Sequence, residues 1–130
     1  MRRFAPLLLL AACADSPAPA VTAVASSAPA AVITRHDGSW TGTATRSFGR
    51  DAECGPTTRP VRMNVVQGRA TGTLPTQGEG AGSIAPDGSL ILRSRLDASA
   101  RAEGRFADRG FTARMVTSSC AWTITMNRAG

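Results

Sequence analysis

The sequence predicts an all-β domain, a small antiparallel up-and-down barrel of about eight strands. From Asp37 onward, short runs alternate apolar and polar residues with a period of two, as strands with one buried face do. Glycine, proline and aspartate separate these runs at spacings typical of tight turns. Two cysteines, Cys54 and Cys120, stand near positions that closure of such a barrel would bring together.

The first half of the domain supplies four strands, the first at Ser39–Ser47 and the fourth, rich in glycine, at Gly78–Ala85. Their expected inward residues are apolar or glycine, and threonine and arginine dominate the positions between them. The inward set is Trp40, Gly42, Ala44, Val61, Met63, Val65, Ala70, Gly72, Leu74 and Ile84.

A Pro86-Asp87-Gly88 turn leads into four more strands. Because short turns join consecutive strands, closing the meander into a barrel removes both exposed edges. A flat sandwich is the alternative fold. The inward set of this half is Leu90, Leu92, Ala102, Gly104, Phe106, Phe111, Ala113, Met115, Trp122, Ile124 and Met126.

Four aromatic residues are expected inside the barrel, either as core or as ligand-facing side chains: Trp40, Phe106, Phe111 and Trp122. An eight-stranded barrel is just wide enough to be filled by side chains or to hold one small ligand. The inward glycines and alanines either leave room for a ligand or let the strands coil tightly, and the sequence leaves both alternatives open.

Residues 1–12 have the layout of an export leader, with two arginines, an apolar run and small residues at the end. The motif Leu10-Ala11-Ala12-Cys13 resembles the lipobox of bacterial lipoprotein precursors. The resemblance implies cleavage before Cys13 and attachment of lipid to it. An ordinary signal peptide with a chance cysteine is the alternative.

The rest of the chain divides in two. Residues 13–36 are rich in alanine, proline and serine, which predicts a disordered tether after the lipidated cysteine. Residues 37–128 form the predicted barrel. With Cys13 assigned to lipid, Cys54 and Cys120 remain as a pair, and we expect a disulfide, in keeping with an oxidising compartment. Two buried free thiols are the alternative.

All 15 basic residues are arginine, and the formal net charge is +6. We expect no nucleic-acid partner, because the arginines are scattered and the leader implies export. Arg93 and Arg95, beside the outward Ile91, mark a possible contact surface. The outward arginines that could form a patch for an acidic glycan or lipid headgroup are Arg62, Arg69, Arg93, Arg101, Arg105 and Arg114.

The sequence predicts no catalytic residue, metal or cofactor, and therefore no enzyme. The only histidine, His36, stands at the junction of tether and barrel, where we expect it to be solvated. We interpret Asp51 and Glu53 as a solvated charged loop rather than an acid pair. The segment Gln77–Gly82 lacks the Lys-Ser/Thr ending of a phosphate-binding loop, so a glycine-rich strand is the better interpretation.

The segment Gly38-Ser39-Trp40-Thr41-Gly42 resembles the Gly-x-Trp start of lipocalin-like and avidin-like barrels. It is also similar to the small eight-stranded barrels of the periplasmic metalloprotease-inhibitor family, in which a disulfide pins the barrel. Those inhibitors bridge nearer positions than Cys54 and Cys120, so no inhibitory residue is assigned to this chain.

The resemblance to lipoprotein precursors implies a lipid-anchored protein. By analogy with the sorting rule of those lipoproteins, Ala14 rather than aspartate after Cys13 implies an anchor in the outer membrane. Its barrel would face the periplasm or the cell surface as a non-enzymatic interaction module. The expected partners, besides the membrane that holds the lipid, are an envelope protein, a glycan or a lipid headgroup. Two alternatives are a protease inhibitor of the periplasmic barrel type and a lipocalin-like carrier of a small apolar ligand.

Overall fold

A computed structural model describes residues 32–130, and residues 1–31 lie outside the described part. The leader, Cys13 and most of the expected tether therefore lie outside it too. The elements are β1 (Gly38–Phe48), α1 (Asp51–Cys54), β2 (Thr58–Val66), β3 (Arg69–Leu74), β4 (Gly78–Ser83), β5 (Ser89–Ser94), β6 (Arg101–Phe106), β7 (Gly110–Val116) and β8 (Ala121–Arg128).

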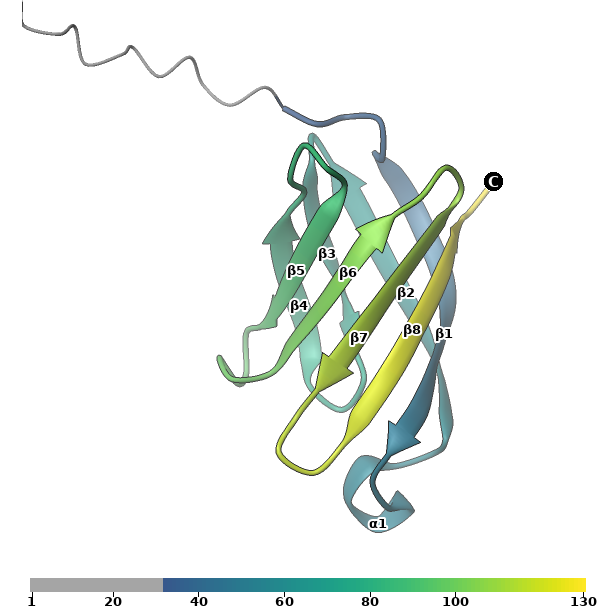
Figure 1. The fold of residues 1–130 in the computed structure, drawn as a ribbon, viewed down its shortest axis with the longest axis vertical. Helices are drawn as coiled ribbons and strands as arrows, with labels where there is room; N and C mark the ends of the chain where they lie inside the picture. The colour runs from purple at the N-terminus through teal and green to yellow at the C-terminus, as the bar shows by residue number, and fades with distance from the viewer. Residues whose placement is uncertain (1–31) are drawn as a thin grey trace, which may run out of the picture. The chain divides into compact units, whose positions relative to one another are not determined.

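The eight strands close into a barrel (Figure 1). Each strand pairs antiparallel with its neighbours in sequence, and β8 pairs with β1 along a seam from Trp40 opposite Arg128 to Phe48 opposite Ala121. A bulge interrupts the seam between Arg46 and Phe48. The predicted up-and-down barrel is confirmed, and the flat sandwich is wrong.

The inward and outward faces follow the predicted alternation. Every residue predicted to face inward, other than the glycines, is buried. Since a shift of one residue would turn an entire strand inside out, the alternation fixes which face of each strand is buried. In β5, for example, Leu90 and Leu92 are buried while Ile91 between them is exposed.

Two local features differ from the prediction. Strand β4 ends at Ser83, although Ile84 still turns inward and forms a bridge with Leu90. The helical turn α1 was not predicted. Its backbone bonds run from the Cys54 and Gly55 amides to the carbonyls of the residues four positions earlier. A single turn of helix brings Cys54 back toward the seam, and a period-two pattern contains no signal for it.

The connections fall alternately at two ends of the barrel, because the strands run antiparallel (Figure 1). We call one the N-terminal end, which contains residues 32–37, the turns at 67–68, 85–88 and 107–109, and the last residues 129–130. The other, the disulfide end, contains residues 49–57, 75–77, 95–100 and 117–120.

Close approach of β1 and β8 depends on the missing side chain of Gly42. A Cβ atom placed there would lie 1.8 Å from the carbonyl oxygen of Thr125 across the seam. Any larger residue at position 42 must push the two strands apart.

We therefore expect Gly42→Ala to lower the free energy of unfolding by about 2–3 kcal/mol, the upper part of the range for overpacking. Urea unfolding followed by tryptophan fluorescence measures this. Gly110→Ala is the matched control, because the nearest atom to its added Cβ is 3.8 Å away. Equal unfolding midpoints for the two variants would contradict the described seam.

Candidate binding surface

An aromatic stack fills the barrel toward its N-terminal end. The ring of Phe106 lies 4.9 Å from Trp40 in an edge-on arrangement and 4.7 Å from Phe111. The imidazole of His36 also stacks on Phe106, with the two ring centres 4.4 Å apart. Three of the four aromatic residues predicted for the interior are therefore packed on one another, directly or through Phe106.

The fourth aromatic residue, Trp122, is fully buried farther toward the disulfide end. Its β8 position is opposite Met115 on one side and Arg46 on the other. Its indole Nε1 has no hydrogen-bond partner among residues 32–130. By contrast, the indole of Trp40 donates to the His36 carbonyl at 2.9 Å.

The inward glycines are surrounded by neighbouring atoms. A Cβ on Gly104 would lie 2.5 Å from the Cβ of Ala113 and 2.6 Å from the ring of Phe111. A Cβ on Gly80 would lie 2.7 Å from a methyl group of Leu74. These glycines therefore serve close packing of strands and side chains, the second of the two alternatives left open by the sequence.

His36 corrects the prediction of a solvated junction histidine. Only 7% of it is exposed, and its Nε2 accepts a hydrogen bond from Nε of Arg35 at 3.1 Å. Ile33 also packs against the core. The last residues assigned to the tether thus belong to the barrel, because Phe106 and Trp40 provide an apolar surface that the local sequence does not reveal.

The environment of His36 lowers its pKa below the usual value. Burial is the largest cause, followed by the positive charges of Arg35 and Arg128, while Asp37 opposes them. Burial and the two arginines thus favour the neutral imidazole, which is the form that can accept the hydrogen bond from Arg35.

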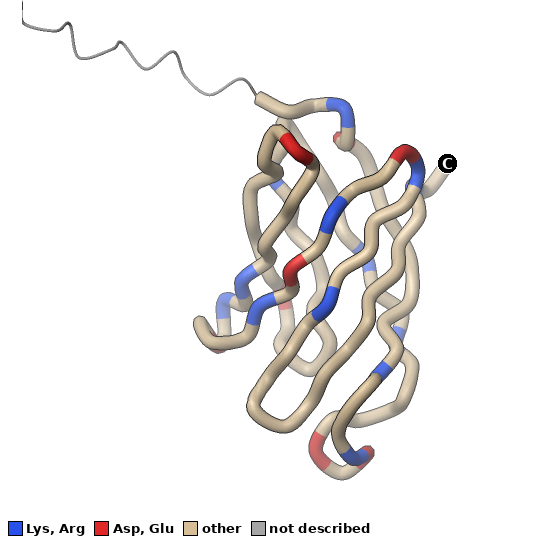
Figure 2. Tube along the Cα trace, in the orientation of Figure 1, with Lys and Arg blue, Asp and Glu red and all other residues tan. Residues whose placement is uncertain are grey.

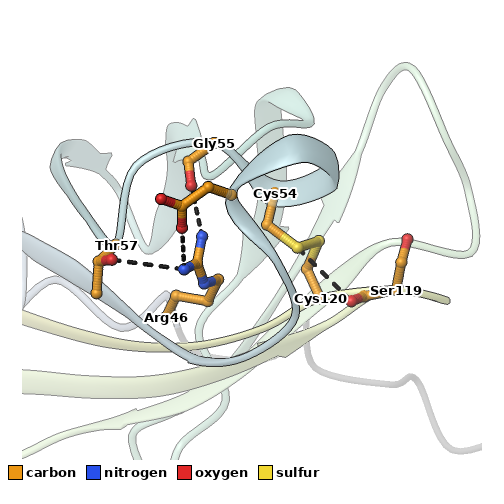
Figure 3. Close-up of polar contacts among 7 residues, drawn as sticks. Arg46, Cys54, Gly55, Thr57, Ser119 and Cys120 are labelled. Carbon is orange, nitrogen blue, oxygen red and sulfur yellow. Dashed lines mark hydrogen bonds and ion pairs between the residues drawn. A yellow bond between two sulfur atoms is a disulfide. The ribbon is translucent and has the colours of Figure 1, made fainter.

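The disulfide end is held by a covalent bond and a network around Arg46 (Figure 3). Cys54 and Cys120 form a disulfide with their Cα atoms 5.8 Å apart. The Arg46 guanidinium donates to the Gly55 carbonyl and pairs with the Asp51 carboxylate. Asp51 therefore has a structural role, as the ion-pair partner of Arg46.

The outward arginines divide into two groups. Arg62 and Arg69 lie on β2 and β3, and Arg105 pairs with Asp87 at 3.4 Å near the N-terminal end. Arg93 and Arg101 are direct cross-strand partners on β5 and β6, and Arg114 lies on the adjacent β7, opposite Glu103. Figure 2 shows several basic positions close together over the lower parts of β5, β6 and β7.

These cations begin a row that crosses five strands, because each residue in it is the cross-strand partner of the next. We call it the basic–apolar row, and it consists of Arg93, Arg101, Val116, Ala121 and Phe48. Phe48 is 69% exposed and Val116 is 49% exposed, whereas the outward Ala121 between them is only 5% exposed. Phe48 and Val116 are therefore two exposed apolar side chains on either side of a buried alanine.

The cationic end of the row is only partly neutralised. Arg101 forms an exposed ion pair with Glu103 at 3.0 Å, and no ion pair within residues 32–130 involves Arg93 or Arg114. Like charges directly opposite each other on a sheet are destabilising. A shallow groove beside the row is lined by Ser99, Arg101, Glu103, Arg114 and Val116.

Comparisons with known protein families, with curated proteins and with solved structures find no match to this chain. Within residues 32–130, no three or more histidine, cysteine, aspartate or glutamate side chains are grouped so that they could hold a metal ion. The helical part of that region includes nothing long and apolar enough to span a membrane.

Two residues of the predicted sites remain to be placed. Cys13 lies outside the described residues. Arg95 follows β5 at the disulfide end, and its neighbour Leu96 is 79% exposed. Sequence reasoning missed Arg46 as a structural residue, because the carbonyl it binds comes from the unpredicted turn after α1.

The disulfide closes a sequence separation of 66 residues. Replacing both cysteines, as Cys54→Ser with Cys120→Ser, is expected to lower the free energy of unfolding by about 4 kcal/mol, since the unfolded chain regains the entropy of that loop. Urea unfolding of the wild type and the double variant, both without reductant, checks the value. Coincident unfolding curves would mean that the bridge contributes nothing to stability.

Burial of neutral His36 also predicts a pH dependence. The lowered folded-state pKa means that stability is fully present above about pH 6.5, the unfolded value, and falls as the pH drops below it. Because His36 is the only histidine, replacing it by glutamine should flatten the change in unfolding midpoint between pH 7.5 and pH 5. An unchanged slope in His36→Gln would contradict the assignment.

Proposed function

We propose that this chain is an outer-membrane-anchored lipoprotein of the cell envelope whose barrel is a non-enzymatic binding module. Cys13 is the lipidated residue of this proposal, and the membrane that receives the lipid is its first partner. The lipobox-like motif and an export leader support the anchor. The disulfide supports export, because such bridges persist in oxidising compartments.

The basic–apolar row is the main observation that supports the proposed binding function. It combines an exposed phenylalanine and valine with cations that lack full neutralisation, on a barrel that presents no free edge strand for pairing. Exposed apolar side chains close to one another and rimmed by polar ones are used at interaction surfaces. The packed interior supports an outer-surface binder over a carrier, because the inward glycines are surrounded by other atoms.

The chemistry of the row points to a partner of the cell envelope with acidic groups beside apolar ones. Arginine guanidiniums recognise carboxylates and phosphates through paired hydrogen bonds. An acidic envelope protein, an acidic glycan or a lipid headgroup provides such groups.

The anchor is tested by growing cells that express the chain with radiolabelled palmitate. The wild type should incorporate label, and Cys13→Ser, which lacks the acceptor thiol, should not. Cys54→Ser with Cys120→Ser is the control for cysteine content and should label like the wild type. Absence of label on the wild type, or label retained after Cys13→Ser, would show that the anchor is assigned wrongly.

The surface is tested by photocrosslinking in intact cells from position 116 in the row and, as a control, from position 66. Val116 and Val66 are 49% and 58% exposed, so they sample solvent to a similar extent. We expect adducts from position 116 alone. The Arg93→Gln and Arg101→Gln pair should reduce them roughly 3- to 10-fold, the size expected for two exposed charge contacts.

Arg62→Gln with Arg69→Gln removes the same charge elsewhere and should leave the adducts unchanged. If both arginine pairs have the same effect, or if position 66 crosslinks as well as position 116, the row is not the contact surface.

A further inference from the structure

A second group of arginines surrounds a hollow at the N-terminal end of the barrel, opposite the end that contains the disulfide. We call it the arginine cavity. Its volume is ≈ 600 Å³, within the range of about 300–1,000 Å³ typical of small-ligand sites. The cavity is lined by Arg35, Asp108, Arg109, Asn127, Arg128 and Gly130.

Hydrogen bonds to neutral acceptors hold two of these arginines in place. Arg128 donates from Nη2 to the Arg35 carbonyl at 2.7 Å, and its guanidinium carbon lies 5.1 Å from the ring centre of Trp40. Arg35 donates to the Pro86 carbonyl at 2.8 Å and to the His36 imidazole at 3.1 Å. Carbonyls and an imidazole orient these cations without neutralising their charge.

The lining contains three arginines and one acidic side chain, together with Gly130, the last residue of the sequence, so positive charge is in excess. No ion pair within residues 32–130 involves Arg35, Arg109 or Arg128, and Asp108 is the one acidic side chain in the lining. Like charges held close together repel one another, and a bound anion relieves that repulsion. Burial is the largest cause of the lowered pKa of the adjacent His36, and the charges of Arg35 and Arg128 lower it further.

We propose that the arginine cavity binds a phosphate group, carried by a small phosphate ester or by a phospholipid headgroup. Guanidinium groups match phosphate oxygens through paired, charge-assisted hydrogen bonds. Three arginines around one hollow suit a group with several anionic oxygens better than a single carboxylate. The site lies at the opposite end of the barrel from the basic–apolar row, so either proposal can fail without the other.

The phospholipid source rests partly on the proposed lipid anchor. Residues 32–37 join the barrel beside this cavity. Lipid on Cys13, 22 residues before Arg35 in the sequence, would tie this domain to a membrane that contains phospholipid headgroups. The soluble phosphate source does not depend on the anchor.

The single histidine makes His36 a specific reporter. The test is a proton NMR titration of the His36 ring in the full chain carrying Cys13→Ser, at constant ionic strength. The probes are inorganic phosphate and glycerol 3-phosphate, with chloride as the blank. A bound phosphate offsets the charges of Arg35 and Arg128, so the pKa of His36 should rise by about 0.5–1 unit.

Three variants locate the binding. Arg109→Gln removes a lining charge whose side chain makes no hydrogen bond within residues 32–130, and it should weaken binding roughly 3- to 10-fold. Asp108→Asn removes the opposing charge and should strengthen binding by a similar factor. Arg62→Gln, an exposed arginine on β2, is the matched control and should bind like the parent.

Vesicles separate the two sources of phosphate. If the soluble probes act as described, the site takes free phosphate esters. If they do not, but phosphatidylglycerol vesicles bind the chain more tightly than phosphatidylcholine vesicles and Arg109→Gln weakens that binding relative to Arg62→Gln, the ligand is a headgroup in a bilayer. The proposal is overturned if no probe or vesicle binds, or if Arg109→Gln and Arg62→Gln behave alike.

Discussion

Pairing of β1 with β8 is the interaction on which the rest of the structure depends. It removes the two free edges of the meander, and it places Trp40 and Ala44 in the same core as Trp122 and Ile124. The disulfide crosses the same junction and holds the connection after β1 to the start of β8. The basic–apolar row also needs the seam, because Phe48 reaches Ala121 only when the barrel is closed.

Because the inward positions are closely packed, both proposed binding sites lie outside the barrel interior, one on its outer surface and one at its N-terminal end. Glycines at inward positions let strands and rings approach, so the interior stabilises the scaffold. Two groups of arginines then lie at different places for different reasons. The β5–β6 register sets Arg93 opposite Arg101, whereas hydrogen bonds to carbonyls and an imidazole hold Arg35 and Arg128 around the cavity. In both proposals, this positive charge is what an anionic partner would bind.

The fold was largely predictable because side-chain direction alternates strictly along a strand. Leu90 and Leu92, on either side of Ile91, therefore revealed the buried face of β5 before any register was known. The surface was less predictable. The alternation along a strand shows whether an arginine points outward, but the residues beside it on the surface depend on the registers between strands. His36 shows the same limit: its burial depends on Phe106, seventy residues away, and only the folded chain brings them together.

Native-state hydrogen exchange of the amides in β1 and β8 tests the closed barrel most directly. The account predicts that seam amides between Gly42 and Thr45, and their partners between Thr123 and Met126, exchange only through global unfolding. Their opening free energies should equal the stability measured by urea and match those of β6–β7 amides, which lie within the sheet. Exchange from the seam at a much lower opening free energy, with β6 and β7 still protected, would mean an open sheet and contradict the account.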